Sequence, residues 1–274
     1  MTKHLAFFLL VGIFSCTDSP KPTPIDENIT PSAPSGIAAP ANITWNVLAT
    51  YPHDKGAYTQ GLEWHNGKLY ESTGDYTNSS LRITDCKTGK VEQTHVMGSK
   101  EIFGEGITIF KNKIYQLTWQ NNVVYEYDVQ NIQQPVKTHT WSLEGWGISH
   151  YKDELVISDG SANLYFVNPT NFKINSTRQV VDNIGPVTSL NELEVIGDYV
   201  YANVYLQDYI VKIDLSNGHV VGKISLSGLI KQYAPAYTAA EGEVLNGIAY
   251  DSTTKKVFFT GKHWPLMFEA NLPQ

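Results

Sequence analysis

Residues 61–70 read Gly61-Leu62-Glu63-Trp64-His65-Asn66-Gly67-Lys68-Leu69-Tyr70. The Asn66-Gly67 dipeptide is typical of a two-residue hairpin turn, because both of its residues accept a positive φ. Apolar and polar residues alternate around it, as they do in short strands. Two further strand-like runs follow at 81–85 and 88–91. The stretch therefore predicts a β-hairpin that opens a unit of several short strands.

The same unit recurs along the chain, with starts at residues 61, 106, 147, 192 and 247. The steps between these starts are 45, 41, 45 and 55 residues. A period of about 40–50 residues made only of strand signals is typical of a β-propeller blade. Five units within residues 43–274 give about 46 residues a blade. We therefore predict an all-β fold, a five-bladed β-propeller.

The two ends of this repeat region predict how the ring closes. The last unit is one strand short, whereas residues 43–51 are strand-like and belong to no unit. We expect residues 43–51 to complete the last blade, because closure removes exposed sheet edges. The longest step between units contains residues 227–233, which we expect to form a short helix.

Composition excludes several classes of protein. The chain has 274 residues, of which 42% are hydrophobic and 17% charged, as in an ordinary globular protein. Its 20 basic and 27 acidic residues give a net charge of −7, so we expect no nucleic-acid partner. Two cysteines are too few for a disulfide framework or a cysteine-based zinc site. Of the two, Cys86 is predicted to be an inert thiol at a strand end.

The first residues are typical of an export signal. Lys3 precedes an apolar run at 5–14, which is too short to span a bilayer, and Ser15-Cys16 follows. This pattern resembles a bacterial lipoprotein signal. It predicts a signal peptide at 1–15 and Cys16 as the lipidated first residue of the mature chain. The alternative is an ordinary secretory signal with an incidental Cys16, and both interpretations export the protein.

Residues 17–42 are predicted to be a flexible tether, because they hold six prolines among small polar residues and little apolar surface. Residues 43–274 would then form the catalytic propeller domain. We expect an exported, lipid-anchored protein in a bacterium, periplasmic or at the cell surface, with contact to the membrane only through the lipid. Thr17 after Cys16 is not an acidic retention residue, which favours the outer membrane. A closed propeller also favours a monomer.

The segments beside the repeat starts are the candidate site, because loops at one end of a propeller channel form its usual ligand site. They contain amide side chains, a lysine, several large aromatics and Glu105 between two glycines. The sequence offers no histidine pair at metal spacing, no D-x-D carboxylate cluster and no nucleophile elbow. We therefore predict an aromatic pocket with one candidate acid–base group, and neither a metal nor a cofactor.

Eleven short motifs occur in an order that resembles the plant-type (type I) glutaminyl cyclase family, over about residues 45–270. Among them are Tyr58-Thr59-Gln60-Gly61-Leu62, Phe103-Gly104-Glu105-Gly106-Ile107-Thr108, Tyr115-Gln116-Leu117-Thr118-Trp119, Glu144-Gly145-Trp146-Gly147, Leu190-Asn191-Glu192-Leu193-Glu194, Leu245-Asn246-Gly247 and Thr260-Gly261-Lys262-His263-Trp264-Pro265. The family is a five-bladed propeller, in agreement with the repeats. The resemblance implies a glutaminyl-peptide cyclotransferase, which converts N-terminal glutaminyl residues of peptides or proteins to pyroglutamate and releases ammonia.

The resemblance also implies the roles of individual residues. It makes Glu105 the general acid and base, with Gln60, Asn191 and Lys262 as polar catalytic anchors. The substrate-binding aromatic residues that it implies are Tyr58, Phe103, Trp119, Trp146 and Tyr205. Two of these depart from the family, since Tyr58 stands where phenylalanine is usual and Tyr205 where tryptophan is frequent. Each departure adds a hydroxyl that needs a partner if buried, which bears on substrate preference.

Two other functions remain open from the residues alone. The first is a non-catalytic surface lipoprotein whose propeller binds peptide or glycan. The second is a metal-dependent propeller hydrolase such as a lactonase, which needs three or four convergent ligands. Glu105, Asn191 and Glu192 are too few to favour it. Glu144 and Glu192 are interpreted as lining the channel, around water or a structural cation.

Overall fold

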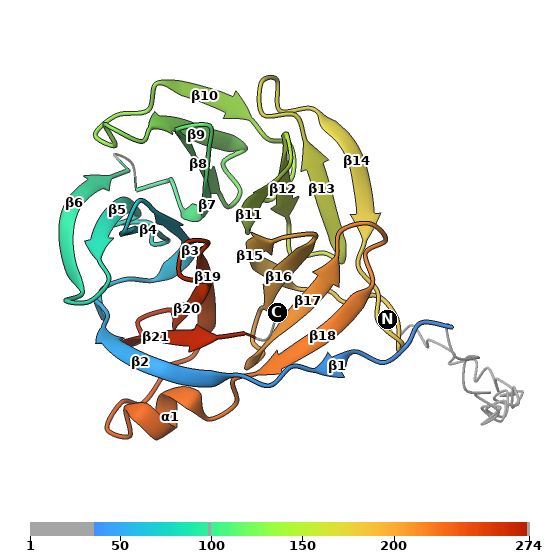
Figure 1. The fold of residues 1–274 in the computed structure, drawn as a ribbon. Helices are drawn as coiled ribbons and strands as arrows, with labels where there is room; N and C mark the ends of the chain where they lie inside the picture. Colours follow the sequence, from blue (N-terminus) through green and yellow to red (C-terminus); the bar gives the residue numbers. More distant parts are fainter. Residues whose placement is uncertain (1–35, 98–99, 273–274) are drawn as a thin grey trace, which may run out of the picture. The chain divides into compact units, whose positions relative to one another are not determined.

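The computed structural model describes residues 36–97 and 100–272, which contain 21 strands in five sheets. The sheets stand around a central axis as the blades of a propeller (Figure 1). The predicted five-bladed β-propeller is therefore confirmed. The predicted signal peptide, Cys16 and most of the tether lie outside the described residues.

The blades follow one another along the chain. Blade one contains β3 (Thr59–His65), β4 (Lys68–Thr73), β5 (Ser80–Asp85) and β6 (Lys90–Val96). Blade two contains β7 (Gly104–Phe110), β8 (Lys113–Thr118), β9 (Val123–Asp128) and β10 (Lys137–Thr140). Blade three contains β11 (Ile148–Tyr151), β12 (Glu154–Ser158), β13 (Asn163–Val167) and β14 (Ile174–Gln179).

The last two blades have additional features. Blade four contains β15 (Leu190–Ile196), β16 (Tyr199–Val204), β17 (Tyr209–Asp214) and β18 (Val220–Ser225), and blade five contains β19 (Leu245–Asp251), β20 (Lys256–Gly261) and β21 (Leu266–Asn271). The expected helix between them is α1 (Leu229–Tyr233). Within the described ranges, no helix has the length and apolar character needed to cross a membrane.

The innermost strands β3, β7, β11, β15 and β19 are those that begin at the predicted repeat starts. They approach one another so closely that some positions have no room for a side chain. A Cβ on Gly61 would lie 2.4 Å from the backbone nitrogen of Ile107. A Cβ on Gly147 would lie 2.0 Å from the backbone oxygen of Asn191. Glycine is required at these starts because neighbouring backbones pack against it. Apolar clusters between adjacent blades then form the core.

The ring closes as expected from residues 43–51. Strand β2 (Asn46–Pro52) pairs antiparallel with β21 and completes blade five, with Tyr51 opposite Met267. The Tyr51 hydroxyl also donates to the Glu269 carboxylate at 2.6 Å. Strand β2, from the beginning of the described chain, and the last strand, β21, therefore share one sheet.

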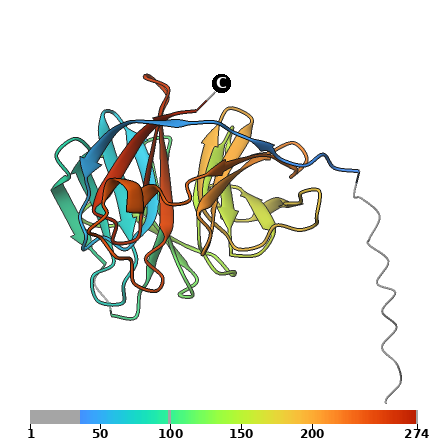
Figure 2. The ribbon, with the colours of Figure 1, turned by 90° about the horizontal axis from the view of Figure 1, so that it is seen from below.

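Strand structure begins within the segment 17–42 that was predicted to be a tether. Strand β1 (Ala41–Asn42) pairs parallel with β18 and adds a fifth strand to blade four. Ile43 packs over Gly222, whose missing side chain makes room for it. As Figure 2 shows, β1 and β2 run along the outer edges of two successive blades. The outer strand β18 is an edge that accepts this pairing, because it has no neighbour on its other side.

Cys86 directly follows β5, as expected, and is buried. Its burial, with Glu269 and Asp85 nearby, raises the pKa of the thiol to about 12. The thiol is therefore protonated at neutral pH, which agrees with an inert cysteine.

Candidate active site

One pocket brings together all nine residues that the sequence singled out as catalytic or substrate-binding. It is a cavity of about 260 Å³ lined by Tyr58, Gln60, Phe103, Glu105, Trp119, Trp146, Asn191, Tyr205 and Lys262. These residues come from all five blades, at or beside the ends of inner strands. The propeller therefore builds a single site from segments that are up to about 200 positions apart in the sequence.

Glu105 is the buried carboxyl group of this pocket, with a residue exposure of 5%. Its Oε1 accepts a hydrogen bond of 2.8 Å from the Gln60 side-chain amide. Burial raises the pKa of Glu105 well above its usual value, while Lys262 opposes the increase and Glu144 adds to it. An increase in pKa is the direction that suits a carboxyl group which has to give up and take back a proton.

Gln60 is held by a residue that sequence reasoning did not assign to the site. The Asn246 amide donates to the Thr59 carbonyl at 3.0 Å and to the Gln60 side-chain oxygen at 3.4 Å. Because Asn246 occupies the oxygen of Gln60, the NH₂ group of Gln60 faces Glu105. Asn246 lies in the Leu245-Asn246-Gly247 motif beside a repeat start. This motif could therefore have identified Asn246 as a site residue.

Lys262 follows β20 and is only 2% exposed. Its ammonium group lies 4.6 Å from the centre of the Tyr58 ring and 5.0 Å from that of Tyr205. Burial lowers the pKa of Lys262 to about 8, and the attraction of Glu105 limits the decrease. The two tyrosine rings therefore hold the cation through cation–π contacts in a pocket with little water.

The two tyrosine hydroxyls that depart from the family pattern meet each other. Tyr58 has a side-chain hydrogen bond with Tyr205. Burial, the Tyr205 and Glu105 charges and this bond raise the pKa of Tyr58 to about 12. The expected need for a hydroxyl partner is thus met within the pocket.

Asn191 presents an acceptor to the pocket. It is 2% exposed, and its side-chain oxygen has no hydrogen-bond partner within residues 36–97 and 100–272. The backbone carbonyl of Asn191 accepts a 2.7 Å bond from the Ser158 hydroxyl. Its main chain is therefore fixed while its side-chain oxygen stays available, which suits an atom that receives a hydrogen bond from a ligand.

The two tryptophans of the pocket share one carboxylate. The indole N–H groups of Trp119 and Trp146 both donate to Oε2 of Glu144, at 2.9 and 3.0 Å. The Gln120 amide donates to its other oxygen at 2.8 Å. Although burial raises the pKa of Glu144, these bonds outweigh it, so the pKa lies below its usual value. Glu144 is therefore ionised and orients both indoles. The sequence placed Glu144 in the channel and did not predict this role.

Glu192, by contrast, lies among the innermost strands as expected. Its two oxygens accept backbone N–H groups of Leu62 and Ile248, at 3.2 and 2.9 Å. Across the parts of the chain that the structure describes, no group of three or more His, Cys, Asp or Glu side chains is arranged to hold a metal ion.

The fold and the pocket together define a five-bladed propeller with a buried carboxyl group among aromatic residues in one pocket. A model of the glutamine cyclotransferase family matches residues 24–272, so this chain belongs to that family. It is 39% identical to a glutaminyl-peptide cyclotransferase of Arabidopsis thaliana over 235 residues, which are 83% of this chain and 71% of the relative. The resemblance inferred from the motifs is confirmed.

A solved structure agrees with this assignment. The chain is similar to the crystal structure of Myxococcus xanthus glutaminyl cyclase, with a TM-score of 0.79 and 32% identity. The match covers 85% of this chain and 98% of that one.

Proposed function

We propose that this chain cyclises N-terminal glutaminyl residues of peptides or proteins to pyroglutamate with release of ammonia, and that Glu105 is its general acid and base. Family membership supports the reaction. The observation that carries the role of Glu105 is its position: a buried carboxyl of raised pKa, bonded to Gln60 and near Lys262 in an aromatic pocket.

The reaction needs one group that moves a proton between two nitrogens. The substrate's α-amine attacks its own γ-amide carbon, forming a C–N bond and a negatively charged tetrahedral oxygen. Ionised Glu105 removes a proton from the attacking nitrogen and then, as the acid, delivers it to the departing amide nitrogen. The bond from the γ-carbon to that nitrogen breaks, and ammonia leaves. Proton transfer of this kind contributes roughly 10²–10⁴-fold to the rate.

The remaining polar groups position the substrate and meet its charge. Lys262 is the cation near Glu105, and it stabilises the developing oxygen anion in surroundings where burial strengthens the attraction. The free side-chain oxygen of Asn191 accepts a hydrogen bond from the α-amine or the γ-amide. Gln60 fixes one oxygen of Glu105, so the carboxyl presents its other oxygen to substrate.

The aromatic walls select the curled conformer that reacts. Trp119 and Trp146 are fixed by Glu144, so the floor of the pocket is rigid before substrate arrives. A small rigid pocket favours the compact arrangement in which amine and γ-carbon are close, and this lowers the entropy cost of cyclisation. These steps use protons and hydrogen bonds of the chain's own residues, so we propose that catalysis requires no metal.

The direct test is ammonia release from a Gln-initiated dipeptide by the purified chain, with and without a strong chelator. The matched control is the N-acetylated dipeptide, which lacks the attacking amine. We expect equal ammonia release with and without chelator, and none from the control. Loss of turnover with chelator would contradict metal-independent catalysis. Saturable binding without ammonia would favour the alternative, a peptide- or glycan-binding propeller.

We also propose, from the sequence of residues 1–42, that the protein is exported and anchored in the outer membrane of a bacterium by lipid on Cys16. The pattern around Ser15-Cys16 and the proline-rich segment after it support this. Mass spectrometry of the mature N-terminus tests it, since a diacyl- or triacyl-modified cysteine is expected. A Cys16→Ser variant should leave the membrane fraction. Sedimentation of the purified chain tests the proposed monomer.

A further inference from the structure

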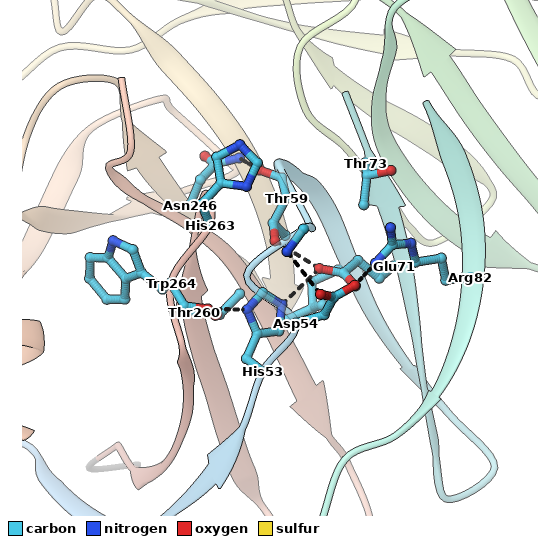
Figure 3. Close-up of polar contacts among 12 residues, drawn as sticks. His53, Asp54, Thr59, Glu71, Thr73, Arg82, Asn246, Thr260, His263 and Trp264 are labelled. Atoms are coloured by element: carbon cyan, nitrogen blue, oxygen red, sulfur yellow. Dashed lines mark hydrogen bonds and ion pairs between the residues drawn. The ribbon is translucent and has the colours of Figure 1, made fainter. Parts of the chain in front are cut away.

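A buried ion pair, His53 with Glu71, stands outside the set of nine residues that line the pocket. His53 follows β2, and its Nε2 lies 2.9 Å from Oε1 of Glu71 on β4. The two side chains are only 4% and 2% exposed. Figure 3 shows the imidazole between Glu71 and the segment of Trp264.

Both nitrogens of the imidazole act as donors. Nδ1 of His53 lies 2.7 Å from the backbone oxygen of Trp264, which can only accept a hydrogen bond. Nε2 donates to the Glu71 carboxylate. Burial lowers the pKa of His53, but Glu71, the Trp264 carbonyl and Asp54 outweigh it, so the pKa is raised. The raised pKa favours the protonated imidazole, whose two nitrogens bond two different parts of the chain.

One of these parts is the turn that carries Lys262. Besides the Nδ1 bond to Trp264, the His53 backbone N–H donates to the Pro265 carbonyl at 2.9 Å. His263 donates its own N–H to Ala57, so the 53–57 segment bonds this turn at several points. His263 has a φ of 60°, a conformation that few residues adopt without support. The contacts from His53 thus hold the turn in the shape that directs Lys262 into the pocket.

The other part is the strand that carries Gln60. Oε1 of Glu71 also accepts the Thr59 hydroxyl at 2.7 Å, and Thr59 precedes Gln60 on β3. Gln60 in turn donates to Glu105. A chain of contacts therefore leads from the Lys262 turn through His53 and Glu71 to Thr59. The next residue, Gln60, bonds the carboxyl of Glu105.

Stability alone does not account for this arrangement. Burying two charges costs about as much free energy as their attraction returns, so apolar replacements of such pairs are often neutral or stabilising. What a buried pair with two directed bonds does supply is a fixed geometry. Arg82, which donates to Asp54 at 2.7 Å and also attracts Glu71, restrains the carboxylate side of the pair.

We propose that His53 and Glu71 are positioning residues for the cyclisation reaction, and that they set the place of Lys262 relative to Gln60 and Glu105. This inference rests on the proposed function of the pocket. Neither residue touches the substrate. Their effect is transmitted through the 262–265 turn and through Thr59.

The chain offers a matched control. His139 and Glu126 form a second buried pair of the same type, at 2.7 Å with side chains 4% and 13% exposed. They lie on β10 and β9, the two outer strands of blade two. A His139→Gln variant therefore removes a comparable buried His–Glu contact without touching the Lys262 turn.

The experiment compares His53→Gln with His139→Gln for ammonia release from a Gln-initiated dipeptide and for Tm. We expect His53→Gln to lower kcat by roughly 10- to 100-fold with little change in KM, because small displacements of catalytic groups cost this much. His139→Gln should keep the wild-type kcat even where its Tm falls as far. If the two variants have equal kcat at equal Tm, the positioning role is overturned.

A double-mutant comparison tests the route through Lys262. In a Lys262→Met background, His53→Gln should lower kcat by several-fold less than in the wild-type background, because one of the two groups that it positions is gone. A loss as large as in the wild-type background would contradict the proposal. Glu71→Gln is the second variant, with the same expectation, and is decisive if His53→Gln does not fold. A wild-type chain without ammonia release, or an unimpaired Glu105→Gln variant, would instead contradict the proposed function.

Discussion

Buried glutamates occur in two regions of this propeller, and they differ in what their oxygens contact. Glu105 lies at the pocket, accepts one hydrogen bond from a side chain and lines the cavity. Glu192 lies among the innermost strands, and both of its oxygens bond backbone N–H groups of neighbouring blades. Burial raises the pKa of both carboxyls well above the usual value.

A raised pKa therefore does not by itself identify the catalytic carboxyl in this fold. Glu63 and Glu194 strengthen the point, because they also accept backbone N–H groups, of Ile109 and Tyr250, and burial raises the pKa of each. These three glutamates join inner strands of different blades. Among these four glutamates, Glu105 alone lines the pocket, so access to a ligand is the property that separates it from the structural three.

The largest expected effect comes from removing the acid–base group. Glu105→Gln should lower kcat by roughly 10²–10⁴-fold, because the amide keeps the shape but transfers no proton. Steady-state ammonia release measures it, with circular dichroism as the check on folding. Glu192→Gln is the matched control and should keep most of the activity. If Glu105→Gln and Glu192→Gln lost kcat equally, the pocket glutamate and the inner-strand glutamate would not differ in function.

The complementary change acts on stability. Glu192→Ala leaves the backbone N–H groups of Leu62 and Ile248 buried without acceptors, at about 1–3 kcal/mol each. We expect the free energy of unfolding in urea to fall by several kcal/mol, while kcat per folded molecule stays near that of the wild type. A stable variant with a low kcat would place Glu192 in the catalytic machinery instead.

A smaller effect is expected at the carboxylate that orients the indoles. Glu144→Gln replaces charged acceptors for Trp119 and Trp146 by a neutral one. Since charged hydrogen bonds exceed neutral ones by about 1 kcal/mol, KM should rise by up to roughly tenfold. Tryptophan fluorescence should change as well. Glu154→Gln, at an exposed bond to Asn175, is the control and should change neither quantity.

The smallest effect is a difference in pH dependence. A carboxyl whose pKa is higher in the folded than in the unfolded chain binds more protons when folded, so stability decreases as pH rises above about 4.3, its unfolded value, towards the folded pKa. Glu105→Gln removes this contribution. The Tm of the variant should therefore equal the wild-type Tm below pH 4 and exceed it increasingly towards neutral pH. A constant difference across this range would contradict the raised pKa.

Much of the fold follows from local patterns in the sequence. Asn-Gly turns, alternating strands and a spacing of 41–55 residues between repeat starts fix the number of blades, and the unassigned strand at 43–51 fixes how they close. These features act within one unit or between neighbouring units. The pairing of β1 with β18 escaped the prediction, because two residues at the end of a proline-rich segment carry no strand pattern of their own.

The site is predictable only in part, for a related reason. The nine pocket residues stand in motifs that resemble a known family. Glu144 and Asn246 stand in the same motifs, but their roles depend on which partner their side chains reach across blades. His53 lies in none of these motifs, and Glu71 lies in one, Tyr70-Glu71-Ser72-Thr73-Gly74, that says nothing of its partner. The histidine and the glutamate become a pair only when blade five meets blade one.

The closing strand has a consequence for how the chain folds. Tyr51 and its partner Glu269 are 218 positions apart, so β2 can pair only with a strand at the far end of the described chain. Contacts of such long range slow folding, because the chain must lose the entropy of a very large loop before they form. Blades one to four can pair their own strands first, whereas blade five is complete only when β2 joins β21. The side of the pocket that bears Lys262 therefore belongs to the blade that depends on the longest-range contact.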